Sequence, residues 1–116
     1  MEKSIRELIS DFQNEIMAGD LLPERAAEIL TQISALLGNI NDRIKDCDIA
    51  YSKVLLKHLE TQEKANRAKI VAETTQEYDD KITARNTREL AIEMLRSLKY
   101  FLRGKEEEIR AGRFMQ

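Results

Sequence analysis

Residues 26–58 read AAEILTQISALLGNINDRIKDCDIAYSKVLLKH, and their apolar residues recur at spacings of four and three. Such a repeat places one apolar side chain per turn on the same face of a helix, as in the seam of a coiled coil. The pattern holds for roughly four and a half heptads, which predicts one long helix. The predicted seam consists of Leu30, Ile33, Leu37, Ile40, Ile44, Tyr51 and Leu55.

The composition of the chain supports an all-α fold. Its 116 residues contain four Gly and one Pro, and aromatic residues make up only 5%. An all-β domain needs many more turn residues, whereas a core of Leu, Ile, Ala and Met is typical of helices. We therefore predict a single helical domain over residues 1–116, with helices at 4–18, 23–73 and 76–110 and a frayed tail at 112–116.

Local signals place the ends of the first helix and the start of the second. Ser4 and Glu7 have the spacing of a capping box, in which the Ser side chain accepts from the backbone of the first turn. Gly19 suits the left-handed residue that follows a helix, and Pro23 suits a first turn, where its missing N–H is harmless. The chain therefore turns between residues 18 and 23.

The connection between the two long helices is predicted near residues 73–75. Thr74 and Glu77 repeat the capping spacing, and the last helix is expected to continue unbroken through Asn86. The predicted topology is a short N-terminal helix followed by a long, antiparallel, coiled-coil-like helical hairpin. Its apolar stripes are wider than one partner covers, so we expect a homodimer or a higher oligomeric bundle. The seam of the last helix is Leu95, Leu98, Phe101 and Leu102.

Charge and cysteine usage exclude several classes of protein. The net charge is −2, so a nucleic-acid footprint can only be local. The single Cys47 excludes an intrachain disulfide and a cysteine-rich zinc module, and one His makes a His-based metal site unlikely within a subunit. No apolar run is long enough to cross a bilayer, and the N-terminus carries charges where a signal peptide is apolar. We expect a cytoplasmic protein that does not bind membranes.

Seven basic residues of the last helix share one side of a helical wheel. At 100° per residue they fall within an arc of about 80°. A row of this kind suits a phosphate backbone or, in an oligomer, a nucleotide pocket. The seven are Lys81, Arg85, Arg88, Arg96, Lys99, Arg103 and Arg110, and we predict that Arg85, Arg88, Arg96, Lys99 and Arg103 bind an anionic ligand.

The alternative interpretation of this row is a solvated helix face. Acidic residues lie beside it at spacings of three and four, where ion pairs form along a helix. Each exposed pair contributes only a few tenths of a kcal/mol. The pairs predicted under this alternative are Arg85–Glu89, Glu93–Arg96 and Arg103–Glu107.

Two acidic motifs, ETQE at residues 60–63 and EYDD at residues 77–80, raise an enzyme hypothesis. Their spacing resembles the metal-binding motif of all-α nucleotide pyrophosphatases of the MazG and dimeric dUTPase type. That resemblance implies that Glu60, Glu63, Glu77 and Asp80 hold Mg²⁺ through carboxylate oxygens. The polar connection KANRAKIVAE departs from the family pattern. Outside this alternative we expect no metal, no cofactor and no catalytic residue.

The C-terminal half of the chain is similar to small, uncharacterised helical proteins of bacteriophages and prophages. RSLKYFLR at residues 96–103 and the Glu run after it carry the resemblance, which extends over about residues 30–110. It implies a phage protein in the host cytoplasm. We predict a non-enzymatic oligomer that binds a nucleotide signal of host defence, as an anti-defence sponge, or a nucleic acid. The alternative is an inhibitor or adaptor that targets a host protein.

Overall fold

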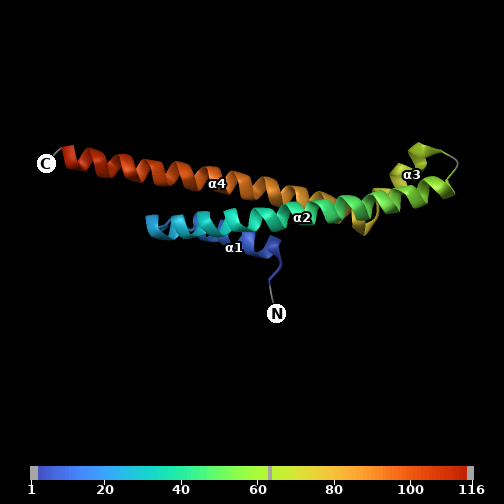
Figure 1. Ribbon diagram of the computed structural model, residues 1–116, viewed down its shortest axis with the longest axis horizontal. Coiled ribbons are helices and arrows are strands. Elements are labelled where there is room, and N and C mark those ends of the chain that lie inside the picture. Colours follow the sequence, from blue (N-terminus) through green and yellow to red (C-terminus); the bar gives the residue numbers. More distant parts are fainter. Residues whose placement is uncertain (1–2, 63, 115–116) are drawn as a thin grey trace. The chain divides into compact units, whose positions relative to one another are not determined.

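The computed structural model describes residues 3–62 and 64–114, and this part of the chain contains helices and no strand. The helices are α1 (Ile5–Met17), α2 (Pro23–Thr61), α3 (Ala65–Ala72) and α4 (Gln76–Phe114) (Figure 1). The all-α prediction is confirmed. No helix in the described ranges combines the length and the apolar character needed to cross a bilayer.

The predicted signals at the first turn are confirmed. The Ser4 hydroxyl accepts a hydrogen bond from the Glu7 backbone N–H at 3.2 Å, so Ser4 caps α1. Gly19 has a φ of 88°, a left-handed conformation that costs an L side chain about 1–2 kcal/mol. Pro23 is the first residue of α2.

The prediction of one helix over residues 23–73 is wrong, because α2 ends at Thr61 and α3 begins at Ala65. In the segment TQEKANRAK the apolar seam is reduced to Ala65 and Ala68, so little apolar surface holds one continuous helix there. The Thr61 hydroxyl also lies 3.4 Å and 3.2 Å from the carbonyl oxygens of Lys57 and His58, a side-chain contact that competes with regular helix geometry.

The last helix starts and ends slightly differently from its prediction. Thr75, one residue after the predicted Thr74, accepts from the Tyr78 backbone N–H at 3.4 Å and precedes the first residue of α4. The helix continues through Asn86, as predicted. It also extends past residue 110 to Phe114, so part of the predicted frayed tail is helical; residues 115–116 lie outside the described residues.

The chain divides into two compact units. Unit 1 comprises Met1–Leu37 and Glu89–Gln116, and unit 2 comprises Gly38–Arg88. α2 and α4 each contribute a segment to both units, since the boundaries fall within these helices.

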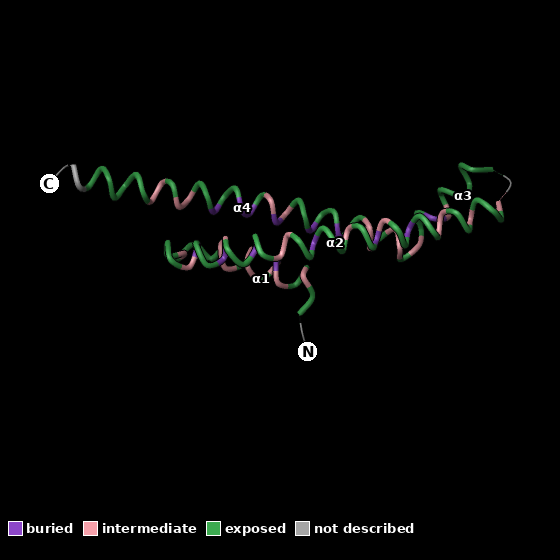
Figure 2. Tube along the Cα trace, in the orientation of Figure 1, coloured by how far each residue is buried: buried purple, intermediate pink, exposed green. Residues whose placement is uncertain are grey.

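Unit 1 packs α1 against the first part of α2 and the second part of α4. Its buried residues, purple in Figure 2, are mostly large and aliphatic. They are Ile9, Ala26, Ile29, Ile33, Ala91, Met94, Leu95 and Leu98. Ile29 is fully buried, although it lies beside the predicted seam, because α2 contacts α1 as well as α4 in this unit.

Unit 2 is a helical hairpin whose core consists mainly of small side chains. The buried residues are Ile40, Cys47, Tyr51, Ala68, Ala72, Ala84 and Thr87. Contacts between its α2 and α4 segments join Tyr51 to Tyr78, Asp48 to Arg85 and Asn41 to Arg88. The residue numbers fall on one helix as they rise on the other, so the two segments are antiparallel, as predicted.

The predicted seam residues differ in how far they are buried. Ile33, Ile40, Tyr51, Leu95 and Leu98 are buried. The others are half-buried: Leu30, Leu37, Ile44, Leu55, Phe101 and Leu102. All of them therefore lie on the packed side of their helices, and none is among the exposed residues.

Candidate functional site

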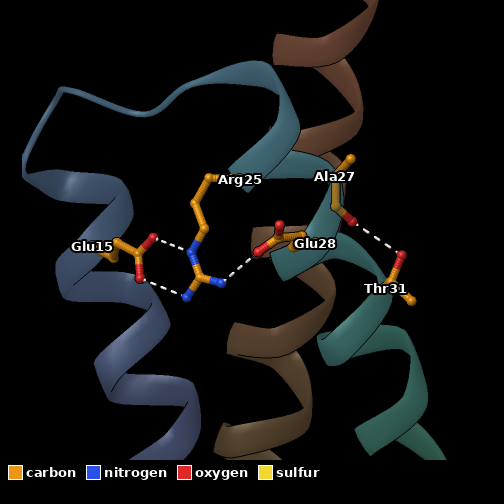
Figure 3. A network of polar contacts seen from close by, with 5 residues as sticks. All are labelled: Glu15, Arg25, Ala27, Glu28 and Thr31. Atoms are coloured by element: carbon orange, nitrogen blue, oxygen red, sulfur yellow. Dashed lines mark hydrogen bonds and ion pairs between the residues drawn. The ribbon is translucent and has the colours of Figure 1, made fainter.

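An ion-pair network ties α1 to the start of α2 in unit 1 (Figure 3). The Arg25 guanidinium contacts both carboxylate oxygens of Glu15, at 2.5 Å and 2.9 Å, and also Glu28 at 2.9 Å. Hydrogen bonding from Arg25 lowers the pKa of the Glu15 carboxyl, and the two carboxylates raise the pKa of Arg25. The network fixes the turn between the helices, and the sequence analysis did not find it.

This turn forms one wall of a cavity of about 240 Å³ in unit 1. Its lining is largely apolar, and the hydroxyl of Ser97 is the polar side-chain group in it. The lining residues are Ile16, Gly19, Leu21, Ser97, Leu98 and Phe101. Leu98 and Phe101 of this lining lie on the packed side of α4, and Ser97 is exposed beside them, whereas the basic row lies on the other side of the helix.

In unit 2 the basic residues of α4 contact α2. The Arg85 guanidinium lies 2.7 Å from the Asp48 carboxylate, and Arg88 Nε donates to the side-chain oxygen of Asn41 at 3.1 Å. Arg85 thus pairs across the hairpin, and its predicted pair with Glu89 is wrong. These two arginines were predicted to bind an anion. In the structure their side chains instead contact polar side chains of α2.

Two further contacts in unit 2 join α4 to α2. The Lys81 ammonium lies 4.5 Å from the centre of the Tyr51 ring, a cation–π contact. The rings of Tyr51 and Tyr78 are 5.4 Å apart and tilted by 52°. Tyr51 is buried, and this desolvation, followed by the charge of Glu73, raises the pKa of its phenol.

In unit 1 three basic residues of α4, Arg96, Lys99 and Arg103, are exposed, whereas Lys105 is half-buried and pairs with Glu108 at 3.4 Å. Arg96 pairs with Glu93 at 2.8 Å, as predicted, and both side chains are about 70% exposed. Lys99 and Arg103 are exposed and make no ion pair or hydrogen bond within the described ranges. Arg103 therefore does not form the predicted pair with Glu107.

An exposed aromatic residue lies among these cations, and it was not among the site residues predicted from the sequence. Tyr100 is 79% exposed, four residues after Arg96 and three before Arg103. Those spacings make side chains neighbours on a helix. A wheel would have revealed it as an aromatic residue on the polar side of an amphipathic helix. We call Arg96, Lys99, Tyr100 and Arg103 the basic–aromatic face.

The residues of the acidic motifs are placed only in part. Glu60 is exposed in the last turn of α2, Glu77 and Asp80 are half-buried near the start of α4, and Glu63 lies outside the described residues. The Asp80 carboxylate accepts from the Gln76 side chain at 2.9 Å. No three His, Cys, Asp or Glu side chains gather into a metal-binding group among residues 3–62 and 64–114.

The comparisons with known proteins identify no relative of this chain. No protein-family model matches the chain, and the comparisons with curated proteins and with solved structures give no significant match.

Proposed function

We propose that this protein acts by binding an anionic, phosphate-containing ligand through Arg96, Lys99 and Arg103 on α4 of unit 1. The observation that carries the proposal is that Lys99 and Arg103 are exposed and have no partner among the described residues. The three cations follow one another at spacings of three and four, so they lie on one side of the helix.

The electrostatics of the face favour an exchange of partners. Glu93 neutralises Arg96 in the free protein, but an ion pair this exposed contributes only a few tenths of a kcal/mol. A phosphate group therefore displaces Glu93 at little cost. Arginine also binds phosphate through two parallel N–H donors, which gives the contact a defined geometry.

The resemblance to phage proteins suggests two forms for this ligand, a nucleotide signal of host defence or a nucleic acid, both met in the bacterial cytoplasm. The two differ in how salt affects binding. A nucleic-acid complex releases counterions in proportion to the phosphates contacted, so its affinity falls steeply with salt. A nucleotide sponge instead discriminates among ligands of equal charge, because its affinity depends on the shape of the ligand.

The proposal is tested by reversing the three charges. The ligands to be tested are fluorescein-labelled dT12, its duplex with dA12, ATP and a cyclic dinucleotide. We expect R96E/K99E/R103E to lose binding to every one of these ligands that the wild type binds. A matched variant, K64E/R67E/K69E, makes the same change in net charge on exposed residues in and next to α3 and should bind normally. Retained binding by the first variant, or equal loss in the second, would refute the role of α4.

We further propose that the protein self-associates through α2 of unit 2. Ile49, Leu56 and Leu59 are 45%, 58% and 41% exposed, and they are separated by seven and three residues. That is the spacing of a heptad seam, which a second copy of the same helix would cover. Sedimentation equilibrium should give a dimer or a larger species, and I49E/L56E should be monomeric. A monomeric wild type at high concentration would contradict the proposal.

A further inference from the structure

Tyr100 is not explained by the packing of unit 1. A buried aromatic side chain removes roughly 150–250 Å² from water and is a major source of stability. Tyr100 is instead 79% exposed, and its side chain makes no hydrogen bond or ring contact within the described ranges. Its neighbours Leu98 and Phe101 face the packed side of the same helix, at 1% exposure and half-buried respectively.

The ring lies between two arginines on the solvent side of α4. With 3.6 residues per turn, Tyr100 is about 40° from Arg96 and about 60° from Arg103 around the helix. The two arginines are about 10 Å apart along the axis. That distance spans about three nucleotides of a stacked strand, in which charges recur every 3.4 Å or so.

We infer that Tyr100 stacks on a nucleobase and that the ligand of the basic–aromatic face is single-stranded nucleic acid. Cations that contact phosphates, together with an exposed aromatic ring that contacts a base face, are the two components of sequence-tolerant single-strand binding. In a duplex the base faces are covered by neighbouring bases, so the ring has nothing to stack on. The inference rests on the proposed function and adds the class of ligand.

The chain offers a convenient probe of this contact. It contains three Tyr and no Trp, so its intrinsic emission comes from tyrosine. Tyr51 is buried and Tyr78 is half-buried against it, which leaves Tyr100 as the ring that a ligand reaches on this face. Stacking on Tyr100 should therefore quench part of the tyrosine emission when unlabelled dT12 is added.

The test compares Y100A, Y100F and I109A with the wild type by fluorescence anisotropy of labelled dT12 and of its duplex with dA12. We expect Y100A to weaken dT12 binding by about 5- to 150-fold, as for the loss of one stacked base. Y100F should stay within about twofold, because it keeps the ring. I109A, which shortens another exposed side chain of α4 in unit 1, should bind normally. Duplex binding should be the same in all four proteins.

The outcomes separate the inference from the proposed function. If Y100A binds dT12 as tightly as the wild type while R96E/K99E/R103E does not bind, the stacking role is overturned and the anion-binding role stands. Equal loss of single-strand and duplex binding in Y100A also overturns the inference. If the wild type binds neither oligonucleotide but binds a nucleotide through the three cations, the ligand class is wrong. If the charge-reversed variant still binds, both fail.

Discussion

Units 1 and 2 use α4 in opposite ways. In unit 2, Arg85 and Arg88 contact polar side chains of α2, and the core beneath them is largely Ala, Cys and Thr. In unit 1 the core contains Ile, Leu and Met. There Lys99 and Arg103 are exposed, and Arg96 and Lys105 pair with glutamates of their own helix. Small side chains bury little apolar area, so polar contacts account for a larger share of the stability of unit 2.

This difference shows which basic residues of the α4 row are available to bind a ligand. Arg85 and Arg103 occupy nearly the same angle on a helical wheel, and the sequence gives no reason to separate them. What separates them is the pairing across the hairpin: Arg85 lies 2.7 Å from the Asp48 carboxylate of α2, whereas Arg103 makes no ion pair or hydrogen bond within the described residues.

Truncation of the core should affect unit 1 more than unit 2. Leu98 is 1% exposed, and L98A should lower the free energy of unfolding by about 2–5 kcal/mol, because it removes apolar contacts and enlarges the neighbouring cavity. Cys47 is 4% exposed, but C47A removes only one sulfur atom and should cost about 1 kcal/mol. Urea denaturation followed by circular dichroism measures both. Equal losses would show that the two cores do not differ as described, and L98M serves as the volume-conserving control.

Glycine substitutions should change stability in opposite directions according to backbone conformation. G19A forces an L side chain into a φ of 88° and should destabilise the protein by about 1–2 kcal/mol. Gly38 in unit 2 and Gly104 in unit 1 lie within helices, and a Cβ added at either meets no atom within 4 Å. G38A and G104A should each stabilise by up to about 1 kcal/mol. Destabilisation by G38A would indicate a close approach that the structure does not show.

Double-mutant cycles should distinguish the ion pairs of the two units. We expect a coupling energy of about 0.2–1 kcal/mol between Asp48 and Arg85, which joins two helices. The Glu93–Arg96 pair lies within one helix and is about 70% exposed, so its coupling should be at most about 0.5 kcal/mol. Alanine variants and thermal denaturation at low salt give both values. A larger coupling for Glu93 and Arg96 would remove the basis for treating Arg96 as available.

The smallest effect concerns the pH dependence of unit 1. The pKa of Glu15 in the folded protein is lowered by hydrogen bonding to Arg25, so the unfolded chain binds its proton more readily. The stabilisation is therefore present above the ordinary pKa of 4.5 and is lost as the pH falls through the lowered value. The Tm of E15Q should lie below that of the wild type at pH 7, and the two should converge at the acid end. A difference that persists unchanged in acid would assign the effect to packing.

The helix ends near Ser4, Gly19 and Pro23 could be predicted from the sequence, whereas the end of α2 at Thr61 could not. Ser4, Gly19 and Pro23 act within one turn of the backbone, so their roles follow from residue type alone. The end of α2 at Thr61 depends on the loss of a buried face over several residues, and no Pro or Gly marks it. The predicted cap of α4, Thr74, is one residue before the observed cap, Thr75. Both are Thr, so residue type does not tell which of them caps the helix.

The sequence predicted the three cations of the basic–aromatic face but not its tyrosine, and the predicted row was longer than the face. Arg96, Lys99 and Arg103 belong to the predicted row, and Tyr100 was available from the same wheel. The periodicity of the sequence determined the all-helical fold, because an apolar residue at every third or fourth position specifies which side of a helix is buried. The tertiary structure alone decided which cations remain available, because an ion pair depends on distance, and residues 48 and 85 come within 2.7 Å only when the hairpin forms.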